Sequence, residues 1–205
     1  MYRRRGVGTR ASGRRLVPHP MHPQLQAVAD GLRAAQARLH RLAESTPPGS
    51  WPARADPDRW SAGECVAHLN LTAIAFLPLI RTALAEAAAI GGGAPARFRR
   101  DPTGWMLWRT AGPPVRVRVR TAAQFVPTGA EPLSQLLTTF DRLQQEQLDV
   151  VAQADGRPIH MVKITSPFNS RLRYNLYACL TILPPHQERH IWQAEQVLER
   201  LRNGR

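Results

Sequence analysis

Four long segments of this chain carry apolar residues at helical spacing, and this periodicity constrains the fold more than any other feature of the sequence. In the first segment Leu25, Val28, Leu32 and Leu39 recur every three, four or seven residues, as expected for a helix that buries one face. Clusters of proline and glycine separate the segments. We therefore expect helices over residues 23–44, 61–89, 133–153 and 172–201.

The connection between the second and third of these helices is too long for a simple hairpin, at about forty residues. It contains a short helical pattern over residues 104–108 and an alternation of valine and arginine over residues 115–120. The alternation is typical of an extended segment with valines inward and arginines in solvent. No convincing sheet is visible, so we predict an all-α fold, an antiparallel four-helix bundle with a long crossover between helices two and three.

The strongly basic composition excludes fewer classes of function than the net charge first suggests. The net charge is +13, but residues 1–20 hold six arginines and no acid, and Lys163 is the chain's one lysine. Arginine, alanine and proline are all abundant, which is typical of a GC-rich genome and does not by itself indicate a basic binding surface. We therefore expect no specific nucleic-acid binding. Cys65 and Cys179 stand alone in apolar runs, which excludes a disulfide scaffold and a CxxC centre.

Residues 1–20 differ from the rest of the chain. They have no apolar periodicity and no hydrophobic core of a secretory signal, so we expect either a disordered basic arm or a translation start placed too early, upstream of Met21. Residues 21–205 form the predicted helical domain. No stretch reaches the 18 or more consecutive apolar residues of a membrane span, and we expect a cytoplasmic protein without a membrane segment.

The second helix begins with the clearest local signal in the sequence. Ser61 and Glu64 have the spacing of a capping box, in which each side chain binds the backbone amide of the other residue. Trp60 precedes the cap and is placed to pack over the first turn. His68 follows on the stripe that should face the bundle interior.

A pair of histidines on the last helix gives the first indication of chemistry. His186 and His190 lie four residues apart, so both imidazoles occupy one face of a helix and can reach one metal ion. The same spacing is common on solvated helix faces that bind nothing. A zinc protease is excluded, because Gln187 stands where those enzymes have the glutamate that acts as general base.

Two motifs together resemble the DinB-like (DinB/YfiT) superfamily. The segment Asp58-Arg59-Trp60-Ser61-Ala62-Gly63-Glu64-Cys65-Val66-Ala67-His68-Leu69-Asn70 is similar to the family's second-helix signature. The segment Pro185-His186-Gln187-Glu188-Arg189-His190-Ile191-Trp192-Gln193 is similar to its closing H-x-x-x-H helix. The resemblance covers about residues 23–201.

This resemblance implies a four-helix bundle with a three-histidine site for a divalent metal ion (zinc, nickel, manganese or iron), formed here by His68, His186 and His190. Some members are metal-dependent transferases that use a low-molecular-weight thiol, which implies a small-molecule substrate, and others have hydrolase or isomerase activities. Members often form homodimers. A non-catalytic, metal-stabilised binding module and a metal-dependent hydrolase stay open as alternatives, as does the question of whether the protein is an enzyme.

Two details of the family pattern bear on this chain's own residues. Gln187 occupies a position where glutamate is frequent in the family, and Pro184-Pro185 stands just before His186, where it would bend the helix or start a new helical segment. Glu64 lies one turn before His68, so it either orients that imidazole or serves the helix cap.

Overall fold

The computed structural model describes residues 20–114, 121–128 and 131–204. Within these ranges the chain forms the following elements: α1 (Pro23–Glu44), the 3₁₀ turn η1 (Pro48–Ser50), α2 (Ala62–Ile90), α3 (Pro102–Ala111), the 3₁₀ turn η2 (Ala123–Phe125), α4 (Leu133–Gln153), β1 (Lys163–Thr165), β2 (Arg173–Asn175) and α5 (Leu176–Asn203). The predicted arm at residues 1–20 and the predicted extended segment at residues 115–120 lie outside the described residues, except for Pro20.

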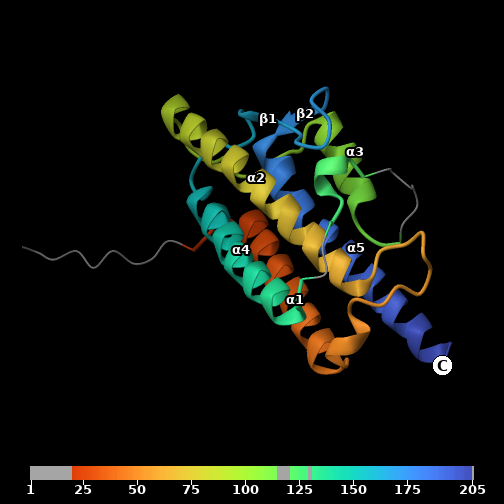
Figure 1. Ribbon diagram of the computed structural model, residues 1–205. Coiled ribbons are helices and arrows are strands. Elements are labelled where there is room, and N and C mark those ends of the chain that lie inside the picture. The colour runs from red at the N-terminus through yellow and green to blue at the C-terminus, as the bar shows by residue number, and fades with distance from the viewer. Residues whose placement is uncertain (1–19, 115–120, 129–130, 205) are drawn as a thin grey trace, which may run out of the picture.

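The four long helices pack side by side, and the prediction of an all-α fold is confirmed (Figure 1). Helix α2 contacts α4 and α5, and α1 also contacts both of them. The colour gradient shows that α1 and α5 run in one direction and α2 and α4 in the other. The parallel course of α2 and α4 requires the long crossover, which carries the chain back to the end of the molecule where α2 begins.

The helices begin and end where local chemistry satisfies their free backbone groups. At the start of α2 the Ser61 hydroxyl accepts from the Glu64 amide at 3.1 Å, and the Glu64 carboxylate accepts from the Ser61 amide at 2.7 Å, which confirms the predicted capping box. At the other end of α2, Gly91 has φ 73°, a left-handed conformation that glycine adopts without strain. Both ends of this helix are therefore fixed by its sequence.

The predicted start of the last helix was wrong. The helix begins at Leu176 rather than at 172, because residues 173–175 form β2 and pair antiparallel with β1, with Ile164 opposite Tyr174. The Asn175 side chain then caps α5 by accepting from the Ala178 amide. The helix also continues through Pro184, whose ring packs so closely against Gly31 of α1 that a Cβ there would lie 2.9 Å from it.

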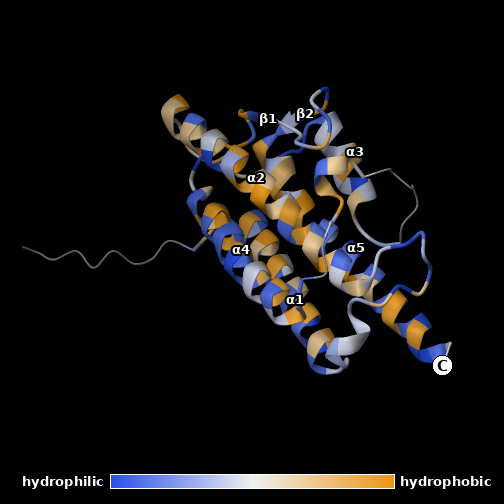
Figure 2. Cartoon of the chain, in the orientation of Figure 1, coloured by the Kyte–Doolittle hydropathy of each residue, from blue (hydrophilic) through white to orange (hydrophobic). Residues whose placement is uncertain are grey.

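Buried apolar residues form two clusters inside the bundle, and Figure 2 shows hydrophobic residues along all four long helices. One cluster surrounds Phe76 and Leu183, towards the end of the molecule that holds the small β-sheet. The other surrounds Leu69 and Ile191, towards the end where α2 begins. His68, His186 and His190 lie on α2 and α5 at the boundary between the two clusters.

Helix α2 is, among the described residues, the one helix whose length and apolar composition would suffice to cross a membrane. The same composition is typical of a helix in the core of a bundle. Here α2 packs against both α4 and α5 and buries the polar side chains of His68, Asn70 and Thr72.

Candidate metal centre

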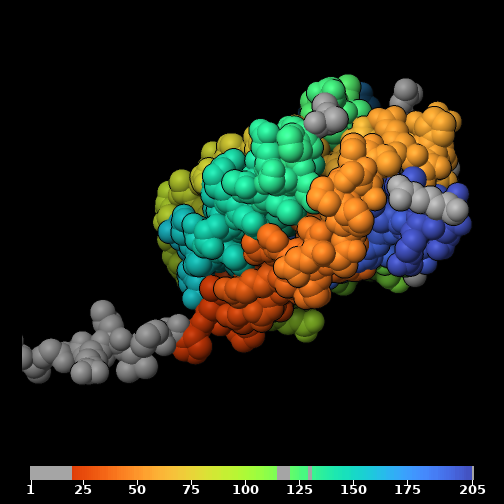
Figure 3. Space-filling view, turned by 60° about the horizontal axis from the view of Figure 1, so that its bottom comes forward, coloured from red at the N-terminus to blue at the C-terminus, as the bar shows by residue number. Residues whose placement is uncertain are grey.

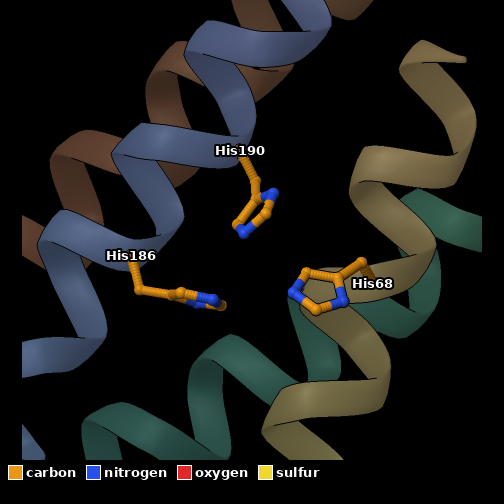
Figure 4. Close-up of side chains that lie close together, drawn as sticks. All are labelled: His68, His186 and His190. Atoms are coloured by element: carbon orange, nitrogen blue, oxygen red, sulfur yellow. The ribbon is translucent and has the colours of Figure 1, made fainter. Parts of the chain in front are cut away.

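The structure brings together the three histidines that the sequence singles out. His68 comes from α2, and His186 and His190 come from consecutive turns of α5. Their rings point towards one another across the space between the two helices (Figure 4). One ligand nitrogen from each ring lies within 4.8 Å of the other two. The antiparallel course of α2 and α5 thus joins residues that are more than a hundred positions apart in the sequence.

The spacing of these nitrogens fits a single divalent cation. In tetrahedral geometry, zinc–imidazole bonds of 2.0–2.1 Å place any two ligand nitrogens about 3.4 Å apart. The observed limit of 4.8 Å is wider by about 1.4 Å, so the rings would turn towards the ion when it binds. In addition, Nδ1 of His190 is buried and has no hydrogen-bond partner among the described residues. Imidazole nitrogens suit zinc, nickel and iron, so the donor set fits the family's expected metals.

All three imidazoles are held in the neutral form that binds metal. Burial lowers the pKa of His68, and the nearby positive charge of Arg189 adds to this effect. Burial also lowers the pKa of His186 to about 3, and it places the pKa of His190 well below its ordinary value. Protons therefore do not compete with a cation for these nitrogens near neutral pH.

The orientation of His68 is fixed by a backbone carbonyl. Its Nδ1 lies 2.8 Å from the carbonyl oxygen of Phe125, in η2 on the crossover. A carbonyl oxygen only accepts hydrogen bonds, so Nδ1 carries the proton and donates it. The Nε2 lone pair is consequently left for a metal ion.

Glu64 does not take the orienting role that its position one turn before His68 suggested. Its carboxylate accepts from the Ser61 amide and forms an ion pair with Arg54. The partner of His68 is instead the Phe125 carbonyl, which lies 57 positions away in the sequence. Sequence reasoning missed this contact because a carbonyl in a loop leaves no pattern in the residue types.

Two aromatic rings flank the histidines. The Trp60 ring centroid lies 4.8 Å from that of His68 and 6.1 Å from that of His190. Trp60 belongs to the segment between α1 and α2, which lies on the surface beside the C-terminal part of α5 (Figure 3). Phe168, in the connection between β1 and β2, lies 6.4 Å from both His68 and His186. The sequence places Trp60 at the start of α2, but nothing in it signals Phe168.

The histidines line a cavity of about 1100 Å³. Helices α2 and α5 form its long walls, and α3, the β1–β2 connection, the segment before α2, residues 121–122 of the crossover and Gln147 of α4 also line it. A volume of this size accommodates a small-molecule ligand and exceeds what bound water alone would need. A cation at the histidines would therefore have room for further ligands from solution.

Comparison with known proteins supports the resemblance seen in the sequence. The family model described as the DinB superfamily matches residues 31–194, a span that includes α2, the crossover and all three histidines. Searches of curated proteins and of solved structures found no match to the chain.

Proposed function

The chain belongs to the DinB superfamily, and from this premise we propose that it binds one divalent metal ion through His68, His186 and His190. The observation that carries the proposal is the convergence of three neutral imidazoles within 4.8 Å at the wall of a large cavity. Three nitrogen ligands leave coordination positions free, as is typical of a catalytic site rather than a structural one.

We further propose that the site serves a transferase that activates a low-molecular-weight thiol. A divalent ion with neutral ligands lowers the pKa of a thiol or a water molecule that it binds. Arg189 would favour a thiolate there, since it lines the cavity and its Nη1 donates to the Thr110 carbonyl at 3.1 Å. This contact holds a positive charge near the histidines.

The groups around the site favour an activated nucleophile over proton transfer by a protein side chain. The acidic residues that line the described part of the cavity are Asp56 and Asp58, and Asp56 is paired with Arg59 at 3.1 Å. Gln187, the neighbour of His186, has no proton to exchange. The described residues would thus position and polarise the reactants, and Trp60 and Phe168 would limit the access of water.

Elemental analysis of the untagged protein tests the metal site. We expect close to one equivalent of metal in the wild type and a loss of that metal in His68→Ala and His190→Ala. His40→Ala is the matched control, since His40 lies on α1 and contacts Asp141 away from the cavity. Retention of metal by both site variants would refute the proposed ligand set.

Turnover assays separate the catalytic alternatives. The metal-loaded protein is mixed with monobromobimane and, in turn, with cysteine, glutathione or coenzyme A, and the thioether product is measured. Metal-dependent and thiol-dependent product supports the transferase. Hydrolysis of a 4-nitrophenyl ester without any thiol would favour the hydrolase instead. Stoichiometric metal with neither reaction would favour a non-catalytic binding module.

A further inference from the structure

The cavity follows α5 on both sides of the histidines, and its two ends differ in chemistry. The residues of α5 that line it extend from Cys179 to Arg200. Over this length an α-helix rises about 30 Å. His186 and His190 lie near the middle, so the cavity extends to both sides of the histidines.

We call the end of the cavity towards the start of α5 the apolar chamber. Because α2 and α5 are antiparallel, the residues after His68 lie beside those before His186 (Figure 1). This end is lined by the apolar side chains of Phe76 of α2, Ile182 and Leu183 of α5 and Leu107 of α3, and also by the polar residues Thr72 and Asn169. The Phe168 ring closes it, with its centroid 5.8 Å from that of Phe76.

We call the end of the cavity towards the C-terminus of α5 the polar chamber. Its walls come from the segment before α2, with Asp58 and Arg59, and from the last turns of α5, where the polar Gln193, Gln196 and Arg200 alternate with the apolar Trp192 and Val197. These side chains suit a polar or charged molecule. The metal site thus lies where an apolar chamber meets a polar one.

We infer that the apolar chamber binds an alkyl or aryl group of the substrate and so places the substrate's reactive end at the three histidines. This inference rests on the proposed metal site and specifies which class of small molecule the site accepts. Transfer of hydrocarbon from water to apolar walls is favourable in proportion to the area buried. A substrate with a hydrocarbon portion is therefore selected over a fully polar one, and the polar chamber is left for the co-substrate.

Binding of linear hydroxamic acids to the cobalt-loaded protein tests this inference. The hydroxamate head group chelates the ion and changes the cobalt visible spectrum, which reports on the metal site. The length of the alkyl tail, varied from acetohydroxamate to octanohydroxamate, reports on the chamber. We expect the affinity to rise about fourfold for each added methylene until the chamber is filled.

Variants on α3 and α2 locate the effect. Leu107→Asn places a polar group in the chamber and should remove most of the dependence on tail length. Met106→Asn is the matched control, because Met106 is the neighbouring residue on α3, is exposed and does not line the cavity. Ala73→Leu narrows the chamber from α2 and should weaken binding of the octyl compound while leaving acetohydroxamate unaffected.

The outcomes distinguish this inference from the proposed function. A spectral response to every hydroxamate, with an affinity that does not change with tail length, would overturn the apolar chamber and leave the metal site intact. Equal length dependence in the wild type and in both chamber variants would also overturn it. A protein that binds no cobalt at the histidines would refute the metal site and this inference together.

Discussion

Helix α5 carries two buried polar clusters that begin one residue apart and differ in how their hydrogen bonds are completed. Gln187 forms one cluster with Gln144 and Gln147 of α4: its Nε2 donates to Gln144 Oε1 at 2.7 Å, and its Oε1 accepts from Gln144 Nε2 at 3.1 Å. His186 and His190 form the other cluster with His68, in which His190 Nδ1 has no partner among the described residues.

The difference separates a structural cluster from a binding cluster. The paired amides of Gln144 and Gln187 satisfy each other, so nothing from solution is needed to complete them. The imidazoles converge, yet His190 Nδ1 is left without a hydrogen-bond partner among the described residues. A buried polar group is costly unless it finds a partner, and a cation would supply one to all three rings at once.

The largest expected effect concerns the histidine cluster. Metal at a hundredfold excess over its Kd should stabilise the wild type by about 2.7 kcal/mol, because binding to the folded state alone shifts the unfolding equilibrium. In His190→Ala this gain should vanish. Urea denaturation with and without metal measures it, and His40→Ala should behave as the wild type. If metal still raised the free energy of unfolding of His190→Ala, the histidine cluster would not be the metal-binding cluster.

A smaller effect is expected in the glutamine cluster. Gln144→Ala leaves the buried amide of Gln187 largely without partners, which should lower the free energy of unfolding by about 2 kcal/mol. Metal stoichiometry should stay unchanged. The control is Gln145→Ala, since Gln145 is the exposed neighbour on α4 and its side chain donates to Asp149. Loss of metal without loss of stability in Gln144→Ala would instead assign the glutamines to the site.

Protonation of the histidine cluster should have a smaller effect. Between pH 7 and pH 6, each buried histidine should lower the free energy of unfolding by less than about 1 kcal/mol. Burial holds the pKa of His190 below its unfolded value, so the unfolded chain takes up the proton first as the pH falls. The stability of the metal-free protein is therefore full above about pH 6.5 and declines as the pH falls below it. His190→Ala should show a shallower decline than the wild type in denaturation midpoints measured across this range. Parallel curves would contradict the assigned protonation state.

The sequence predicts the fold well where a helix has one apolar face and clear ends. Residues 23–44 and 133–153 form helices with the predicted bounds, and Ser61 and Glu64 form the predicted cap. The start of α5 was misplaced because the strand at residues 173–175 is too short to show a period of two. The helix also continues through Pro184, because tertiary packing against Gly31 outweighs the local preference of proline.

The candidate site was predictable only in part. Helical spacing places His186 and His190 on one face, but the approach of His68 is a tertiary contact that the family resemblance, rather than periodicity, suggested. The Phe125 carbonyl and the Phe168 ring come from short irregular segments, where no repeat of residue types marks what faces the site. Sequence patterns predict which face of a helix or strand is buried, but they do not predict which loops cover that face.

The smallest expected effect concerns Glu64, which lies beside the histidine cluster in sequence but belongs to the helix cap in the structure. Glu64→Gln preserves the reach of the side chain to the Ser61 amide and removes the ion pair with Arg54. An ion pair with an exposed arginine contributes little to stability, so the free energy of unfolding should fall only slightly. Loss of a group that orients a ligand histidine typically lowers metal affinity by about 10- to 100-fold. Because Glu64 serves the helix cap instead, the affinity of Glu64→Gln for metal should stay within about twofold of the wild type. Competition titrations with a chelator measure this affinity, and a tenfold loss in Glu64→Gln would show that the carboxylate supports His68 after all.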